Sequence, residues 1–146
     1  MVELIVTMVL IGIMAAVAIP RLDALRGFDQ VAYRDKLRAA VEFSRKSAVA
    51  SRRYVCVRIT SNLLTVTRDT RTPETATTFC NAASEAPLPL PGSATNILAA
   101  SGSATLSGTA SFYFDPLGQA STSAAYTITG EGTETVNVVA ASGYVF

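Results

Sequence analysis

Histidine is absent from the 146 residues of the chain. Without an imidazole the chain cannot form a serine–histidine catalytic pair or a histidine-containing metal site. No two acidic residues are spaced as a general acid and base on one element. The segment Gly130-Glu131-Gly132 is too short for a phosphate-binding loop and lacks the lysine that follows one. We therefore expect no enzyme activity, no metal and no cofactor.

Cysteine is also scarce, with Cys56 and Cys80 as the only two. A zinc site has little support because no third or fourth ligand accompanies them. In an exported domain two cysteines indicate one disulfide, whereas two buried free thiols are the alternative. We expect a disulfide that joins the first strand of the domain to the loop after the second strand.

The net charge is low, at +1, and does not indicate whether the chain as a whole binds polyanions. Its distribution is uneven, because residues 21–53 hold nine of the twelve basic residues. A solvated helix face is the simplest interpretation. The alternative is a surface that contacts a neighbouring subunit or DNA, and its candidate residues are Arg45, Lys46, Arg52 and Arg53.

A long apolar block occupies the N-terminus, from Met1 to Pro20. No charged residue occurs between Leu4 and Ile19, and the block just reaches the about 20 residues that a membrane-spanning helix needs. The exception is Glu3. An acid in such a segment is costly and marks a functional site by default, so Glu3 needs a partner.

Three interpretations of this block compete. The Ala16-Val17-Ala18 segment fits the cleavage site of a secretory signal peptide, but no Lys or Arg precedes the apolar run. An ordinary single-span anchor would leave Glu3 as a tolerated interfacial acid. Thirdly, Val2-Glu3-Leu4-Ile5-Val6 and the later run from Gly12 to Pro20 resemble the N-terminal helix of type IV pilins and type II secretion pseudopilins. That family carries the acid in the same motif and a proline near the end of the apolar run.

The resemblance implies an α+β type IV pilin fold, in which a long N-terminal helix packs on a C-terminal antiparallel sheet domain and spans the inner membrane with its first half. It implies a structural subunit whose domain is periplasmic, with other pilin subunits, the inner-membrane assembly platform and prepilin peptidase as partners. It also implies that Glu3 pairs with the N-terminal amine of a neighbouring subunit. Family precursors begin with a basic leader ending in glycine, followed by a phenylalanine that becomes methylated. This sequence opens with Met1, so we expect that leader upstream.

Three regions follow from the patterning: a membrane and assembly half of the helix at 1–20, an amphipathic half at 21–53, and a β-rich domain at 54–146. Pro20 removes one backbone donor and should kink the helix without ending it. Residues at three- and four-residue steps form a narrow apolar stripe suited to close packing on a sheet. These residues are Tyr33, Leu37, Ala40, Val41, Ser44 and Ala48.

The β-rich region begins with a hairpin, whose strands at 54–60 and 63–68 flank a turn at Ser61-Asn62. Residues 69–94 have the composition of a loop, and 97–110 are weakly patterned, with a short strand near 104–106. Further strands are predicted at 111–114, 125–129, 135–139 and 142–146. Asp115-Pro116-Leu117-Gly118 fits a type I turn.

The segment from Phe114 to Gly118 and the closing Ser142-Gly143-Tyr144-Val145 also resemble minor pseudopilins of the H type and minor pilins of MSHA-type pili. This second match favours a minor over a major subunit, of either a pilus or a secretion pseudopilus. Two other functions stay open. One is a membrane-tethered periplasmic binding module, and the other is a DNA-uptake minor pilin that uses the four basic residues named above.

Overall fold

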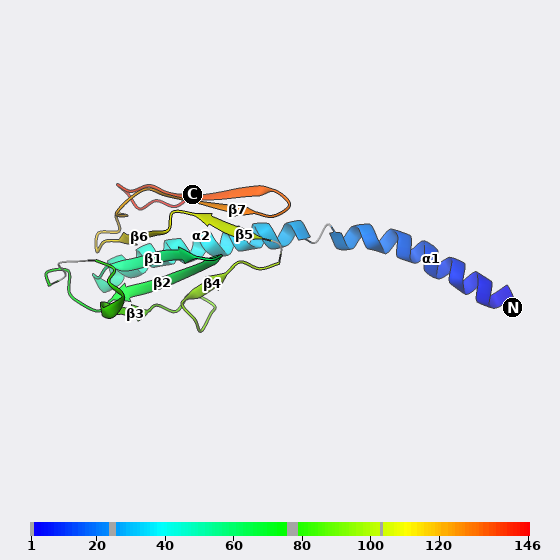
Figure 1. The fold of residues 1–146 in the computed structure, drawn as a ribbon, viewed down its shortest axis with the longest axis horizontal. Helices are drawn as coiled ribbons and strands as arrows, with labels where there is room; N and C mark the ends of the chain where they lie inside the picture. Colours follow the sequence, from blue (N-terminus) through cyan, green and yellow to red (C-terminus); the bar gives the residue numbers. More distant parts are fainter. Residues whose placement is uncertain (1, 24–25, 76–78, 103) are drawn as a thin grey trace.

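The computed structural model describes residues 2–23, 26–75, 79–102 and 104–146, with only the backbone at 17–23 and 26–28. Two helices come first, α1 (Val2–Asp23) and α2 (Arg26–Ser51). Figure 1 shows α1 extending away from the rest of the molecule, while α2 runs along the sheets. The predicted packing of the N-terminal helical region on the sheets is therefore seen for α2.

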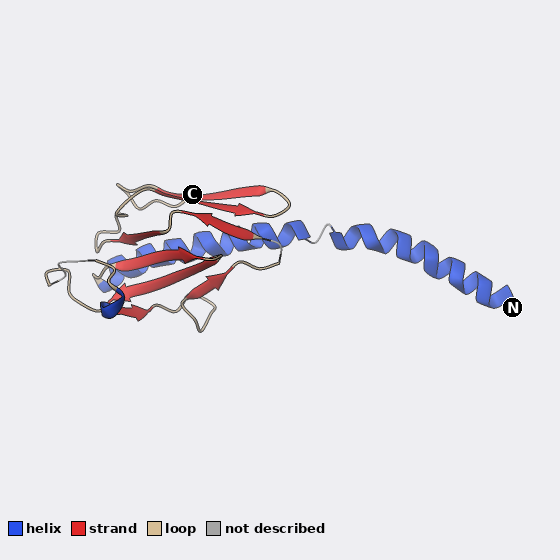
Figure 2. Cartoon of the chain, viewed as in Figure 1, coloured by secondary structure: helices blue, strands red, loops and turns tan. Residues whose placement is uncertain are grey.

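The strands form two antiparallel sheets (Figure 2). The larger sheet has the order β3-β2-β1-β6, with β4 also paired to β2, and the smaller has the order β5-β7-β8. A short 3-10 helix, η1 (Ala82–Ser84), precedes β3. The strand bounds are β1 Val55–Thr60, β2 Leu63–Asp69, β3 Glu85–Pro87, β4 Ile97–Ala99, β5 Thr105–Gly108, β6 Ser111–Phe114, β7 Ala124–Thr129 and β8 Thr133–Val138.

The predicted stripe on α2 is confirmed, since all six of its residues are buried. They pack on the inward-facing residues of the strands, which alternate with outward-facing ones as the pleat requires. Tyr33, Leu37 and Val41 are at most 1% exposed and anchor this face of the helix. The α+β architecture with an N-terminal helix packed on antiparallel sheets is thus confirmed, although the strands divide into two sheets rather than one.

The helix boundaries differ slightly from the prediction. Helix α1 runs through Pro20 and ends at Asp23, and α2 ends at Ser51 rather than at residue 53. The left-handed backbone of Arg52, with φ 50°, stops the helix there. Residues 24–25 lie outside the described part, and the kink at Pro20 stays a prediction. Among the described residues, no helix is both long and apolar enough to cross a membrane, so the structure does not support the predicted span.

Three strand predictions need correction. The region 69–94 holds η1 and the short β3, whose Pro87 is tolerated because β3 lies at the edge of the sheet. Residues 97–110 contain two strands, β4 and β5, instead of one. The predicted strand at 142–146 is reduced to one bridge, Val138 to Val145, because Gly143 turns the chain with φ 61°. The turn at Asp115–Gly118 is confirmed by the Gly118 N–H, which donates to the Asp115 carbonyl at 2.9 Å.

Gln30 connects α2 to the turn between β7 and β8. Its side chain is buried, donates from Nε2 to the Ile128 carbonyl at 3.2 Å, and accepts at Oε1 from the Gly132 N–H at 3.1 Å. Gln30→Ala is expected to lower the free energy of unfolding by about 1–3 kcal/mol, because both backbone groups lose a partner. Urea unfolding of the detergent-solubilised chain measures this. Lys46→Ala, at an exposed position on the same helix, is the control. If Gln30→Ala lowers the free energy of unfolding no more than Lys46→Ala does, the stabilising role of Gln30 is contradicted.

Candidate functional site

Helix α1 presents a long apolar surface to solvent. Every residue from 2 to 16 is exposed, and the large apolar side chains among them are each 50–76% exposed. These are Val2, Leu4, Ile5, Val6, Met8, Val9, Leu10, Ile11, Ile13 and Met14. Folded monomers seldom leave so long an apolar surface in water, so a partner must cover it. Helix α1 is therefore the candidate functional site, a surface through which the chain associates with a partner.

Glu3 lies in the first turn of α1 and is exposed. In the described part of the chain it has no hydrogen-bond or ion-pair partner. An acid is favoured near a helix N-terminus by the helix dipole, but that effect is worth only about 0.3–1 kcal/mol. Thr7, the other polar side chain of this surface, donates its hydroxyl to the Leu4 carbonyl at 2.9 Å and is satisfied within the helix. A partner that covers residues 2–16 therefore meets one unpaired charge, that of Glu3.

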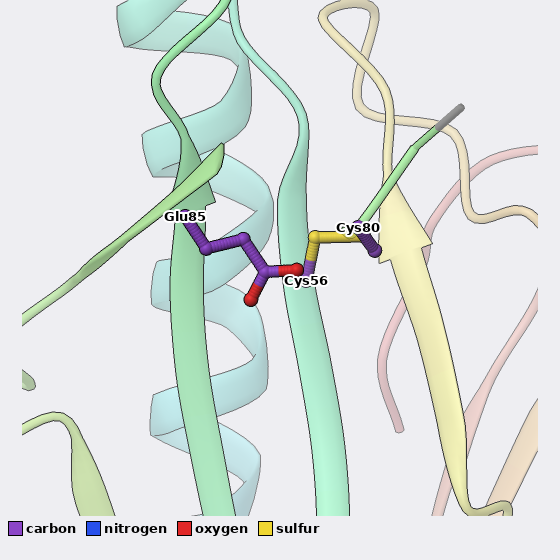
Figure 3. A group of neighbouring side chains, drawn as sticks. All are labelled: Cys56, Cys80 and Glu85. Atoms are coloured by element: carbon purple, nitrogen blue, oxygen red, sulfur yellow. A yellow bond between two sulfur atoms is a disulfide. The ribbon is translucent and has the colours of Figure 1, made fainter. Parts of the chain in front are cut away.

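The predicted disulfide is confirmed. Cys56 on β1 and Cys80 in the loop after β2 are bonded, with their Cα atoms 5.7 Å apart. Figure 3 shows the Glu85 carboxyl directed towards this bond, and the three groups lie within 4.8 Å of one another. The cluster does not suit a metal, because both sulfurs are committed to the disulfide and thiolates are the species that bind metals. The disulfide ties the loop to the outer face of the sheet.

An ion pair beside the disulfide strengthens this attachment. Arg58 donates to both carboxyl oxygens of Glu85 at 2.5 Å and, through Nη2, to the Cys80 carbonyl at 2.6 Å. The Thr67 hydroxyl donates to Glu85 at 2.6 Å. The hydrogen bonds from Arg58 are the main reason that the pKa of Glu85 is lowered. One carboxylate, on a side chain that is 5% exposed, thus joins β1, β2 and β3.

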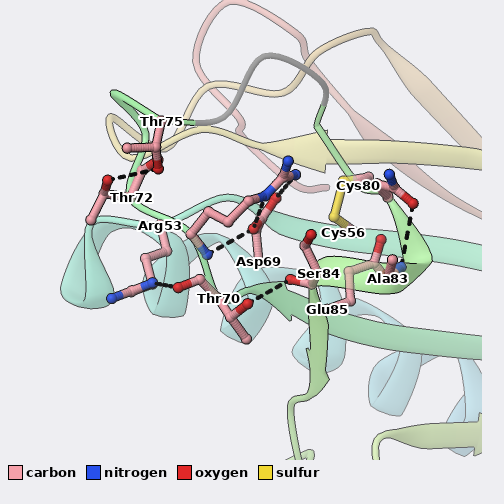
Figure 4. A network of polar contacts seen from close by, with 12 residues as sticks. Arg53, Cys56, Asp69, Thr70, Thr72, Thr75, Cys80, Ala83, Ser84 and Glu85 are labelled. Atoms are coloured by element: carbon pink, nitrogen blue, oxygen red, sulfur yellow. Dashed lines mark hydrogen bonds and ion pairs between the residues drawn. A yellow bond between two sulfur atoms is a disulfide. The ribbon is translucent and has the colours of Figure 1, made fainter.

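A second carboxylate holds the start of the same loop (Figure 4). Asp69 is fully buried and accepts from the Arg71 backbone N–H at 2.9 Å and from the Arg71 guanidinium at 2.7 and 3.1 Å. The Arg71 side chain is the main cause of the lowered pKa of Asp69. Nearby, Arg53 donates to the Thr70 carbonyl, and the Thr70 hydroxyl donates to the Ser84 carbonyl at 3.0 Å. These contacts stabilise the loop.

Both lowered carboxyl pKa values predict a loss of stability in acid. A carboxyl whose pKa is lowered by folding stabilises the native state above its unfolded pKa, and this contribution disappears as the pH falls through the folded value. We expect stability to hold down to about pH 5 and to fall below about pH 4. Urea midpoints of the double variant Asp69→Asn/Glu85→Gln should be lower at pH 7 and vary less between pH 7 and pH 3. An unchanged pH dependence, equal to that of the exposed control Glu74→Gln, would contradict this role.

The four predicted basic residues border two hollows, and their role as a contact face stays a prediction. Arg45 and Lys46 border a hollow with Gly143 and Tyr144, whereas Arg52 and Arg53 line a different one. Two of the four are engaged within the chain: Arg45 donates to the Gly118 carbonyl at 3.2 Å, and Arg53 to the Thr70 carbonyl. Lys46 and Arg52 are exposed.

Comparison with known proteins places the fold. No family model and no curated protein matches the chain. Two crystal structures of the type IV minor pilin FimU from Pseudomonas aeruginosa are similar in structure. The first has a TM-score of 0.55 and 14% sequence identity, and the match covers 83% of this chain and 88% of the FimU chain. The second has a TM-score of 0.53 and 14% sequence identity, and the match covers 79% of this chain and 89% of the FimU chain. At this identity the likeness shows the fold, and the fold is type IV pilin-like, as the N-terminal motif predicts.

Proposed function

We propose that this chain, which has the type IV pilin fold, is a structural minor subunit of a type IV pilus or of a type II secretion pseudopilus. It enters the helical filament, or its tip, through α1. The observation that carries the proposal is the run of ten large, exposed apolar side chains on α1. Its role is structural rather than enzymatic.

In the proposed filament the α1 helices of neighbouring subunits pack against one another. Full burial of a large aliphatic side chain contributes about 1.5–3 kcal/mol relative to exposure in water, so these ten side chains strongly favour keeping α1 out of water. Before assembly the same surface is proposed to lie in the inner membrane, with residues 54–146 in the periplasm. The proposed partners are other pilin subunits, the assembly platform and, for a chain with an upstream leader, prepilin peptidase.

Glu3 sets the register in this proposal. A carboxylate buried among apolar helices is expensive unless it is paired. The resemblance to pilins indicates the N-terminal amine of the neighbouring subunit as the partner, exposed by leader cleavage and then methylated. Any other register leaves both charges unpaired, so the pair favours one arrangement of the helices.

Fractionation of cells that express the chain tests this function. A filament subunit is expected in the sheared fraction, in a polymer that mild detergent does not dissolve. A membrane-tethered binding module would instead leave the membrane as a detergent-solubilised monomer and be absent from the sheared fraction. A DNA-uptake subunit would in addition bind duplex DNA with an affinity that falls steeply as salt rises.

A further inference from the structure

Three aromatic side chains gather on the outer face of the larger sheet, away from α2. The ring centroids of Tyr54, Phe79 and Tyr113 lie between 4.1 and 5.5 Å from one another. Tyr113 stands between Phe112 and Phe114, which are buried in the core, so the alternation of the strand turns Tyr113 to the outer face. Phe79 is 37% exposed. The cluster therefore presents aromatic surface to solvent on the side of the sheet that has no helix.

A hollow of about 280 Å³ opens beside these rings. Phe79 and Tyr113 form its aromatic wall, and Ser111 and Ser121 bring hydroxyl groups to it. The Ser121 hydroxyl accepts from the Tyr113 N–H at 3.1 Å, so its own hydrogen is left to donate. Ser111 is exposed, and its hydroxyl has no hydrogen-bond partner among the described residues. The hollow thus combines aromatic surface with hydroxyl groups that are available to a ligand.

The loop that carries Phe79 is fixed at the next residue. Cys80 is bonded to Cys56, and its carbonyl accepts from Arg58 at 2.6 Å. The backbone of Cys80 is left-handed, with φ 57°, a conformation that residues other than glycine adopt when their surroundings enforce it. These attachments hold the aromatic wall in place before any ligand arrives. A preformed wall loses little entropy on binding, as is typical of ligand sites.

The charge at the hollow is compensated within the chain. Arg58 is the charged side chain among the described lining residues, and both of its terminal nitrogens donate to Glu85. A charged ligand therefore meets no unpaired counter-charge. A wholly apolar ligand would remove water from the Ser111 and Ser121 hydroxyls without replacing its hydrogen bonds. The hollow fits a neutral ligand that carries hydroxyl groups at its edge and has an apolar face.

We infer that this hollow binds a saccharide through one pyranose ring. A pyranose has neutral hydroxyl groups around its rim, and the C–H groups on one face form an apolar patch that packs on an aromatic ring. Phe79 and Tyr113 supply the ring surface, and Ser111 and Ser121 bond the rim hydroxyls. The volume of about 280 Å³ lies just below the about 300–1,000 Å³ of sites for drug-sized ligands, which suits a single sugar residue.

The site lies on the opposite side of the sheet from α2. Val55 and Val57 of β1 are buried in the core that α2 covers, whereas Cys56 and Arg58 alternate with them and line the hollow. Association through α1 does not use this face. Saccharide binding is therefore a property of the single chain and does not rest on the proposed filament function.

Saturation-transfer NMR on the full chain tests this inference, in a detergent without a sugar headgroup. The probes are the methyl glycosides of glucose, galactose, mannose and N-acetylglucosamine, each at millimolar concentration. We expect transfer to the ring C–H protons of at least one of them. Glucose 6-phosphate is the charged comparison. Absence of transfer to all four glycosides overturns the inference, and so does transfer to glucose 6-phosphate alone.

Variants locate the binding. Phe79→Ala should weaken it by about tenfold or more and Ser111→Ala by about three- to tenfold, whereas the exposed controls Phe146→Ala and Ser101→Ala should bind as the wild type does. Ser111→Ala removes a hydroxyl without an internal partner, so it should unfold at the wild-type urea concentration even if Phe79→Ala loosens its loop. Wild-type binding by Ser111→Ala, or an equal loss in Phe146→Ala, contradicts the site. Absence of the wild-type chain from filaments would contradict the proposed function and leave this inference intact.

Discussion

Glu3→Gln is expected to leave the amount of chain in the membrane unchanged and to reduce its incorporation into filaments by about a hundredfold or more. Glutamine is nearly the same shape as glutamate, so the apolar packing of α1 is kept. In the proposed filament, however, the neighbouring subunit's amine is then buried without a counter-charge. Removing one partner of a buried ion pair costs about 3–5 kcal/mol, which corresponds to this loss.

The measurement compares membrane and sheared-filament fractions of Glu3→Gln with those of the wild type by immunoblotting. Glu131→Gln is the matched control, because it removes an equivalent charge from an exposed turn of the domain. Filament levels equal to wild type, at equal membrane levels, would show that Glu3 is an interfacial acid without an assembly role.

Loss of the disulfide is expected to have the largest effect on stability. The double variant Cys56→Ala/Cys80→Ala should lower the free energy of unfolding by about 3 kcal/mol, because the bond closes a loop across a separation of 24 residues. The change also frees the loop segment whose Cys80 carbonyl accepts from Arg58, so that contact should weaken as well. Urea unfolding of the detergent-solubilised protein measures both contributions together.

Chemical reduction of the wild type provides the matched comparison. A reducing agent should bring the wild-type unfolding midpoint close to that of the double variant and leave the variant's own midpoint unchanged. If the free energy of unfolding of the double variant falls by well below 1 kcal/mol, the ion pairs of Arg58 and Arg71 hold the loop without the disulfide.

Local patterns predicted the parts of the fold that depend on neighbouring residues. The burial of Tyr33, Leu37 and Val41 follows from their three- and four-residue spacing on one helix face. The turn at Asp115–Gly118 follows from the residue preferences of its four positions. The disulfide follows from a count of two cysteines in a domain expected to be exported.

The parts that sequence patterns missed depend on contacts between distant segments. The strands divide into two sheets because β5 pairs with β7 and not with β6, its neighbour in sequence. Gly108 permits this pairing, since a Cβ there would lie 2.2 Å from the Ala125 carbonyl oxygen. Strands of three and four residues between small residues and prolines carry too little periodicity to be recognised.

The polar network around the loop was missed for the same reason. Arg58 and Glu85 are 27 residues apart in sequence and meet only because β3 and β1 both pair with β2. One signal was present in the sequence. Arg58 stands in the middle of a strand of β-branched residues, and a charge in that position needs a partner on a neighbouring strand.

Thiol accessibility of α1 in isolated filaments tests most directly whether this surface is covered by other subunits. Ile11→Cys, at a side chain that is 68% exposed in the single chain, is labelled with a maleimide in sheared filaments and again after the filaments are dissociated. Thr122→Cys, in an exposed loop of the domain, is the control. We expect Ile11→Cys to react only after dissociation and Thr122→Cys to react equally in both states. Equal labelling of Ile11→Cys before and after dissociation would show that α1 is not buried in the filament and would contradict the proposed function.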